Sequence, residues 1–156
     1  LEARGQPANL TIVGDGPEEP RLRRRAIALG VADRVVFAGS RRGAELVTLL
    51  NRHRVMVVPS VWDEPFGVVA LEGLACGCVP IVSRSGGLPD AVGPSGVVVP
   101  KHDASALADA VARLLGDAGA RAALLASAPR HLAEHTRDRV ARRYLDVIED
   151  AYRRAR

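Results

Sequence analysis

Residues 55–83 read VMVVPSVWDEPFGVVALEGLACGCVPIVS. The first five residues are nearly all apolar, which is typical of a parallel strand covered on both faces. A polar loop over 61–67 leads into a predicted helix over 68–76, which Gly77 ends, and a second strand follows over 80–83. The stretch therefore predicts a β-loop-α-β unit.

The same alternation continues on both sides of this stretch. Further strands are predicted at 9–13, 34–38 and 96–99. A turn is predicted at 86–89, and helices at 18–29, at 44–52, from near Asp103, at 120–134 and at 137–154. Such alternation favours parallel strands joined by right-handed crossovers. We therefore predict an α/β fold, a doubly wound Rossmann-like parallel sheet flanked by helices, with residues 1–156 in a single domain.

Charge and composition bear on the choice of partner. The 156 residues are 47% hydrophobic and 3% aromatic, with a formal charge of +4. Arginines gather at 21–25, 137–143 and 153–156, with acidic residues within or close to these stretches. Because base stacking needs aromatic side chains, we interpret these clusters as solvated helix faces and predict no nucleic-acid partner.

Cysteine and histidine patterns indicate no metal site. Cys76 and Cys78 are too close for an ordinary disulfide and lack the second pair that a zinc site needs, so they are interpreted as small buried residues. No apolar run approaches the ~20 residues of a membrane span, and we expect a soluble, cytoplasmic protein. No function is assigned to the histidines, which show no metal-binding or triad spacing: His53, His102, His131 and His135.

The segment from Glu64 to Glu72 combines two carboxylates with a helix N-terminus. Glu64 precedes the predicted helix, whose first free amides, at Phe66, Gly67 and Val68, can donate to hydroxyls or phosphate oxygens. Glu72 lies about one and a half turns into the helix, among apolar residues where a carboxylate is costly unless paired. It either pairs with an arginine or binds two vicinal hydroxyls. The second alternative describes a polyol site with room for a diphosphate.

A glycine-rich turn follows the first predicted strand. Gly14-Asp15-Gly16-Pro17 is similar to the start of a dinucleotide-binding fingerprint but lacks its third glycine. A tight turn alone and the wall of a nucleotide pocket are equally open interpretations.

These motifs together resemble the C-terminal, donor-binding domain of glycosyltransferase family 4 (glycosyltransferase group 1), retaining enzymes of the GT-B fold. The likeness covers nearly the whole chain in order. It is carried by IVGDGP at 12–17, VVFAG at 35–39, VPS at 58–60, EPFG at 64–67, Glu72, Ala75, Gly77, PIV at 80–82, GGLP at 86–89 and GVVV at 96–99.

The resemblance assigns roles to these residues. It implies that Glu64 contacts hydroxyls of the donor sugar, and we assign Glu64 to catalysis through positioning rather than as a general base or nucleophile. Glu72 would bind the ribose. Three further residues would bind the donor sugar through their backbone amides: Phe66, Gly67 and Val68. Four further residues, in loops that vary within the family, would border the nucleoside: Gly14, Gly16, Ser40 and Arg41.

The resemblance also implies a reaction. A hexose-type sugar would pass from a nucleotide-diphosphate donor to an acceptor hydroxyl with retention, without a metal or other cofactor. In the family, a preceding strand and helix hold the diphosphate through an Arg and a Lys, and an N-terminal domain binds the acceptor. We expect this chain to lack both, including the first strand of the full domain, and to be inactive alone.

Further expectations follow from the missing half. Peripheral membrane association would reside there, and the apolar surface left by its loss could cause self-association. Two alternatives stay open: a nucleotide-sugar epimerase of the same architecture, and a non-catalytic nucleotide-binding or assembly module.

Overall fold

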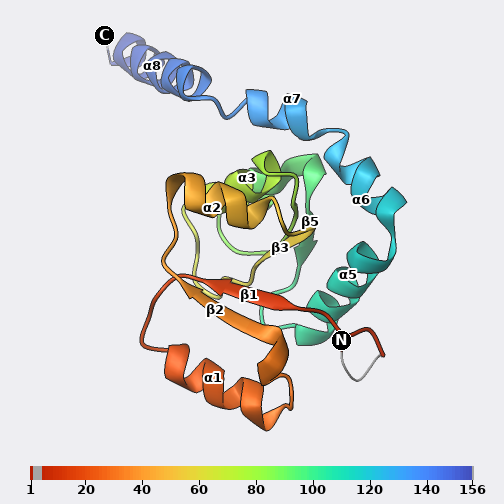
Figure 1. Cartoon of the computed structure of the whole chain (residues 1–156). Helices are drawn as coiled ribbons and strands as arrows, with labels where there is room; N and C mark the ends of the chain where they lie inside the picture. The colour runs from red at the N-terminus through yellow and green to blue at the C-terminus, as the bar shows by residue number, and fades with distance from the viewer. Residues whose placement is uncertain (2–4, 156) are drawn as a thin grey trace. The chain divides into compact units, whose positions relative to one another are not determined.

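The computed structural model describes residue 1 and residues 5–155 (Figure 1). The chain forms two compact units, residues 1–52 and 53–156, and each is described by itself. Whether they form one domain stays a prediction. The strands are β1 (Leu10–Val13), β2 (Val35–Gly39), β3 (Val55–Val58), β4 (Val79–Ser83) and β5 (Val97–Val99). The helices are α1 (Glu19–Ala28), α2 (Gly43–Leu50), α3 (Val68–Ala75), α4 (Leu88–Val92), α5 (Ala104–Gly116), α6 (Ala118–Leu125), α7 (Ala128–Ala133) and α8 (Arg137–Arg154), with 3-10 turns η2 (Ala32–Arg34) and η3 (Gly93–Ser95).

The first unit contains one parallel pair of strands. β1 pairs with β2 in register from Leu10 opposite Val35 to Ile12 opposite Phe37, and the register shifts before Val13. Pro20 lies in the first turn of α1, where backbone amides have no partner within the helix and the missing N–H of proline costs no hydrogen bond. The predicted β-turn-α steps of this unit are confirmed to within about two residues.

The second unit contains a three-stranded parallel sheet in the order β3-β4-β5. Val55 lies opposite Val79, and Ile81 lies opposite Val97. Parallel strands linked by helices confirm the predicted α/β class.

The central strand β4 is the one covered on both faces. All five of its residues are buried, whereas β3 is half-buried apart from Val58. The sequence predicted full cover for β3. That prediction is wrong because β3 pairs only with β4 within the described part of the chain, and a strand paired on one side keeps an exposed edge.

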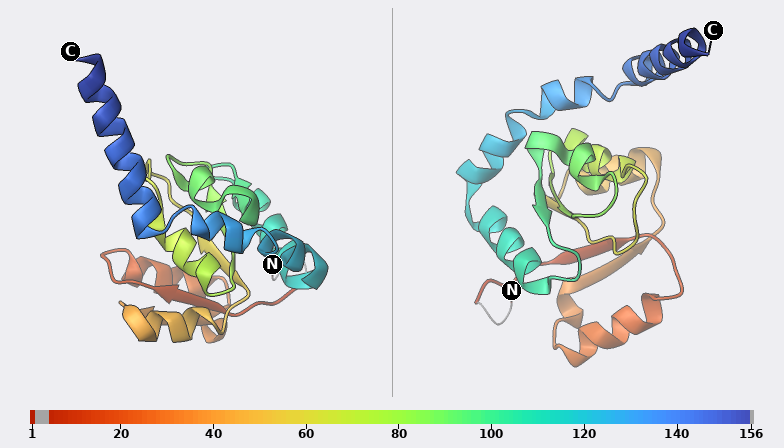
Figure 2. Two further views of the ribbon diagram at one scale, coloured as in Figure 1. Left: turned by 90° about the horizontal axis from the view of Figure 1, so that it is seen from above. Right: turned by 180° about the vertical axis from the view of Figure 1, so that it is seen from behind.

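Two apolar clusters lie on opposite faces of this sheet. Successive side chains of a strand point to opposite faces, so Ile81 and Val82 belong to different clusters. One cluster joins the sheet to α3 and α4, and the other joins it to α5; Figure 2 shows these helices on the two sides of the strands. The first cluster is Val58, Ala70, Val82, Leu88 and Val92. The second is Val79, Ile81, Val99, Ala110 and Leu114.

Two predictions about local structure need correction. The helix predicted over 120–134 is two helices, α6 and α7. Pro129 is in the first turn of α7, and a proline there cannot continue the preceding helix because its ring clashes with the carbonyl of residue i−4. The turn predicted at 86–89 is confirmed at its glycines, but Leu88 and Pro89 already belong to α4.

The arginine clusters lie on solvated helix faces, as predicted. Arg23 pairs with Glu19 in α1 at 2.7 Å, and Arg153 pairs with Glu149 in α8 at 3.0 Å. Such exposed pairs each contribute little to stability. Arg156, which belongs to the third cluster, lies outside the described residues. Among the helices that the structure describes, none has the length and apolar character needed to cross a membrane.

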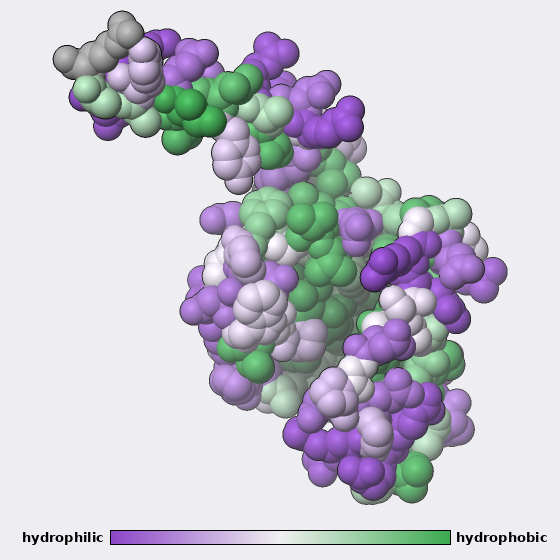
Figure 3. Space-filling model, turned by 90° about the vertical axis from the view of Figure 1, so that its left-hand side faces the viewer, coloured by the Kyte–Doolittle hydropathy of each residue, from purple (hydrophilic) through white to green (hydrophobic). Residues whose placement is uncertain are grey.

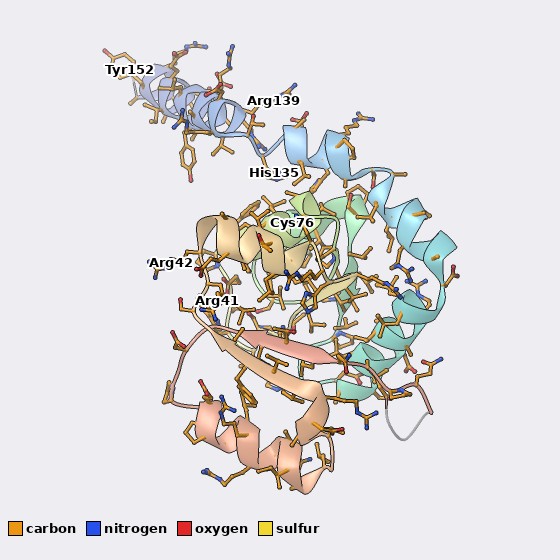
Figure 4. The ribbon with its side chains drawn as sticks, in the orientation of Figure 1. Arg41, Arg42, Cys76, His135, Arg139 and Tyr152 are labelled. Atoms are coloured by element: carbon orange, nitrogen blue, oxygen red, sulfur yellow. The ribbon has the colours of Figure 1, made fainter. Side chains whose placement is uncertain are left out.

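α8 has an apolar stripe that no other element buries. Its exposed large side chains are Tyr144, Leu145, Val147, Ile148 and Tyr152. Figure 3 shows hydrophobic side chains, in green, along one side of this helix, and Figure 4 shows Tyr152 projecting from it. No residue of α8 is buried in the described chain.

A core substitution tests the two-cluster arrangement. Ile81→Ala should lower the free energy of unfolding by about 2–5 kcal/mol, because the surrounding cluster cannot collapse fully onto the cavity. Urea denaturation measures this change. The matched control Ile148→Ala, on the exposed stripe of α8, should change it by less than about 0.5 kcal/mol. Equal effects of the two substitutions would contradict the burial pattern.

Candidate functional site

The segment 61–67, called here the donor loop, connects β3 to the first turn of α3. Gly67 is the N-cap of α3 with φ 96°, a left-handed conformation that favours glycine. The first amides of a helix have no partner within the helix. The amides predicted to face a ligand, at Phe66, Gly67 and Val68, therefore lie at the junction of loop and helix.

Two side chains, Ser85 and Lys101, and the backbone amide of Gly87 hold the donor loop. The Ser85 hydroxyl donates to the carbonyl of Trp62, and the Gly87 amide donates to the carbonyl of Glu64 over 2.8 Å. Lys101 Nζ lies 2.6 Å from Asp63 Oδ1. This ammonium group holds the pKa of the exposed Asp63 carboxyl below its usual value, mainly through the hydrogen bond and then through its charge.

The two glutamates differ in their surroundings. Glu64 is half-buried and Glu72 is exposed. The sequence placed Glu72 among apolar residues and predicted a costly burial; this is wrong, because Glu72 is on the solvent side of α3, one turn after the exposed Val68. Within the described residues no arginine pairs with Glu72, so the purely structural alternative for this carboxylate has no support.

Two histidines, to which the sequence analysis assigned no function, lie next to Phe66 of the donor loop. The His135 ring is 5.4 Å from the Phe66 ring and 4.6 Å from the His131 ring. His131 Nε2 lies 2.8 Å from the carbonyl oxygen of Ala91, and His135 Nδ1 lies 2.9 Å from the carbonyl oxygen of His131. Figure 4 labels His135 between α7 and α8. Their spacing of four residues, which places two side chains on one helix face, was the available signal.

The residues predicted to border the nucleoside lie together in the first unit. The Gly14 amide donates to the carbonyl of Gly39 over 2.9 Å, and the Ser40 amide donates to Asp15 Oδ2 over 3.2 Å. Arg41, labelled in Figure 4, follows in the loop between β2 and α2, two residues before α2 begins. The turns 14–17 and 39–41 are thus adjacent, as their positions after parallel strands predict.

An apolar cavity of about 200 Å³ lies at the carboxyl ends of the second unit's strands. Val57, Ile81 and Leu107 line it, and none of the predicted site residues does. We therefore base the site on the hydrogen bonds of the donor loop and not on this cavity.

Comparison with known proteins identifies the family. The family model described as glycosyl transferases group 1 matches residues 1–131. The chain belongs to this family. It is 43% identical over 141 residues to a D-inositol 3-phosphate glycosyltransferase of Salinispora tropica, covering 88% of this chain and 29% of that protein. A protein of the same name from Acidothermus cellulolyticus is 43% identical over 150 residues, covering 91% and 33%. The chain thus spans about a third of these relatives' length.

Solved structures share the fold. Sucrose-phosphate synthase from Thermosynechococcus elongatus matches with a TM-score of 0.79 and 32% identity, over 92% of this chain and 38% of that one. A glycosyltransferase from Rickettsia africae matches with a TM-score of 0.81 and 18% identity, over 96% and 41%. The Anabaena protein HepE in complex with UDP and glucose matches with a TM-score of 0.76 and 23% identity, over 91% and 40%. These matches confirm the GT-B type of fold.

Substitution of Gly67 tests the strained start of α3. Gly67→Ala should lower the free energy of unfolding by about 1–3 kcal/mol, because alanine disfavours this φ and its Cβ would overlap the buried Leu88 side chain. Thermal or urea denaturation measures the effect. Gly116→Ala, where an added Cβ meets nothing within 4 Å, is the control and should be neutral or slightly stabilising.

The thiols at the end of α3 give a second test. Neither Cys76 nor Cys78 forms a disulfide bond within the described residues. Burial and the neighbouring Cys76 raise the pKa of the Cys78 thiol to about 11. Because the thiolate is the reactive form, iodoacetamide at pH 8 should modify the half-buried Cys76 before Cys78, as mass spectrometry can show.

The same shift makes stability depend on pH. The thiol of the unfolded chain has a pKa of about 8.5. Cys78 therefore contributes to the free energy of unfolding below that pH, and this contribution is lost as pH rises toward 11.

In the iodoacetamide experiment, equal modification of both thiols in the folded protein, and not only in guanidinium, would contradict the burial of Cys78.

Proposed function

We propose that this chain binds a nucleotide-diphosphate sugar and positions it for retaining transfer of a hexose-type sugar to an acceptor hydroxyl. Membership of the glycosyl transferases group 1 family supports glycosyl transfer and argues against the epimerase alternative. The relatives named D-inositol 3-phosphate glycosyltransferase also support glycosyl transfer, and the UDP and glucose in the HepE complex support a nucleotide-sugar donor.

The observation that carries the proposal is the arrangement around the first turn of α3. Glu64 precedes the helix in a loop held by Ser85 and Gly87, and Glu72 is on its exposed face with no partner in the described residues. A carboxylate that is exposed and free can accept from two ribose hydroxyls at no cost of breaking an internal pair. Glu64 would accept from hydroxyls of the sugar.

The chemistry assigned to these residues is positioning. Charge-assisted hydrogen bonds from carboxylate to sugar hydroxyls fix the anomeric carbon relative to the acceptor, and fixed orientation can supply a large part of a barrier reduction. Amides at the start of α3 would stabilise negative charge on the leaving diphosphate, because the N-terminus of a helix is electropositive. The proposal includes no metal ion.

Several expectations from the sequence remain part of this proposal. They are the contribution of Gly14, Gly16, Ser40 and Arg41 to nucleoside binding, a cytoplasmic location with peripheral membrane association, self-association of the chain, and inactivity of the chain alone. Acceptor binding belongs to the two thirds of the relatives' length that this chain does not span.

Two substitutions separate the roles of the glutamates. Glu72→Ala should weaken nucleotide binding by about 1.5–3 kcal/mol, the cost of losing charged hydrogen bonds. Glu64→Ala should lower transfer far more than nucleotide affinity. Calorimetry and turnover assays with UDP, GDP and ADP sugars, on the native protein that carries this sequence, measure both effects.

The exposed Glu149 of α8 provides the control, since Glu149→Ala changes the charge equally without touching the loop. Unchanged binding and turnover in both Glu64→Ala and Glu72→Ala would disprove the site. Binding of nucleotide without transfer to any acceptor would instead favour the non-catalytic module.

A further inference from the structure

The turn after β4 passes directly beneath the backbone of the donor loop. A Cβ added at Gly87 would lie 2.6 Å from the carbonyl oxygen of Pro65 and 2.8 Å from Cα of Phe66. A Cβ added at Gly86 would lie 2.8 Å from the backbone nitrogen of Glu64. Contacts this short do not occur for real Cβ atoms. The two chain segments therefore touch backbone to backbone over the residues around Glu64.

Hydrogen bonds join the same two segments. The Ser85 side chain is 1% exposed and its hydroxyl donates to the carbonyl of Trp62, while the Gly87 amide donates to the carbonyl of Glu64. The bonds reach the loop two residues apart, on either side of Asp63. A shift of the loop would separate both carbonyls from these donors, so the two bonds favour this one position of the loop.

The turn itself has little freedom to move. It follows the fully buried β4, and the Arg84 amide donates to the carbonyl of Val99 over 2.7 Å. Leu88, immediately after the turn, is 0% exposed in the cluster with Val92. If the turn and the loop are pushed apart, the exposed donor loop is therefore the segment that moves.

We propose that Ser85, Gly86 and Gly87 are positioning residues that set the location of the Glu64 carboxylate for sugar transfer. They act through the loop backbone and touch no substrate. The proposal rests on the proposed function of Glu64 and adds residues to which the sequence assigned no binding role. It implies that enlarging or loosening this turn affects the transfer step more than nucleotide affinity, because Glu72 is on α3 and not on the loop.

A merely structural role would give a different result, and the chain contains matched controls. Gly96, like Gly87, has no positive φ and no space for a Cβ, which would lie 2.6 Å from Val92 Cβ and 2.9 Å from the carbonyl oxygen of Pro80. Ser95, like Ser85, is buried and its hydroxyl bonds another group, Ser127 Oγ at 2.8 Å. None of these control contacts involves the donor loop.

The experiment compares Gly87→Ala with Gly96→Ala, and Ser85→Ala with Ser95→Ala, in the native protein that carries this sequence. Folded fractions are measured first by denaturation, and turnover is corrected for them. We expect Gly87→Ala and Ser85→Ala to lower kcat by about tenfold or more, since small misplacements of a catalytic arrangement have large effects. Affinity for UDP, GDP or ADP should fall by a much smaller factor than kcat, because Glu72 is on α3. Ser85→Thr, which keeps the hydroxyl, should recover much of the kcat lost in Ser85→Ala.

Each outcome decides the matter. If Gly87→Ala and Ser85→Ala lower kcat no more than their controls, or weaken nucleotide binding as strongly as transfer, the positioning role is wrong. Glu64→Ala, measured beside them, separates the proposed function of Glu64 from the positioning role of the turn. If Glu64→Ala abolishes transfer while the turn variants behave like their controls, only the positioning role is overturned. If Glu64→Ala leaves transfer unchanged, the proposed function fails and the positioning role fails with it.

Discussion

Burial of β4 on both faces is the constraint on which the second unit depends. All five residues of this strand are buried, and its alternating side chains contribute to both apolar clusters. α3 and α4 pack on one face and α5 on the other, so the direction of β4 determines where each connecting loop begins. In parallel sheets these connections at the carboxyl ends carry ligand sites. A buried strand thereby locates an exposed loop.

The loop is held by backbone contacts more than by side chains. Among the residues that the structure describes, only Lys101 and Ser85 contribute side-chain bonds to it, and the Lys101–Asp63 pair is exposed on the Asp63 side. Exposed pairs are weak, whereas Gly86 and Gly87 allow a contact that any larger residue would exclude. This division explains how a loop can be fixed in place while its polar groups face solvent.

Sequence patterns predicted the local elements well because those elements depend on local chemistry. The all-apolar β3, the glycine at 77 and the proline-led helices are features of neighbouring residues. Tertiary relations were harder. The exposure of Glu72 depends on which face of α3 packs on the sheet, and the contact of His135 with Phe66 joins residues 69 positions apart. The break at Pro129 was readable from the sequence and was missed because apolar periodicity continues through it.

The apolar stripe of α8 couples two equilibria. None of its 18 residues is buried, so the helix gains no stability from packing in the described chain and depends on its own hydrogen bonds and on ion pairs such as Arg154–Asp150. Most helical stability in proteins comes from packing of an amphipathic face. A surface that covers Ile148 and Tyr152 would therefore also stabilise the backbone beneath them. Association through α8 would then be coupled to the helix–coil equilibrium of α8, and its heat capacity and temperature dependence would contain both a burial and a helix–coil contribution.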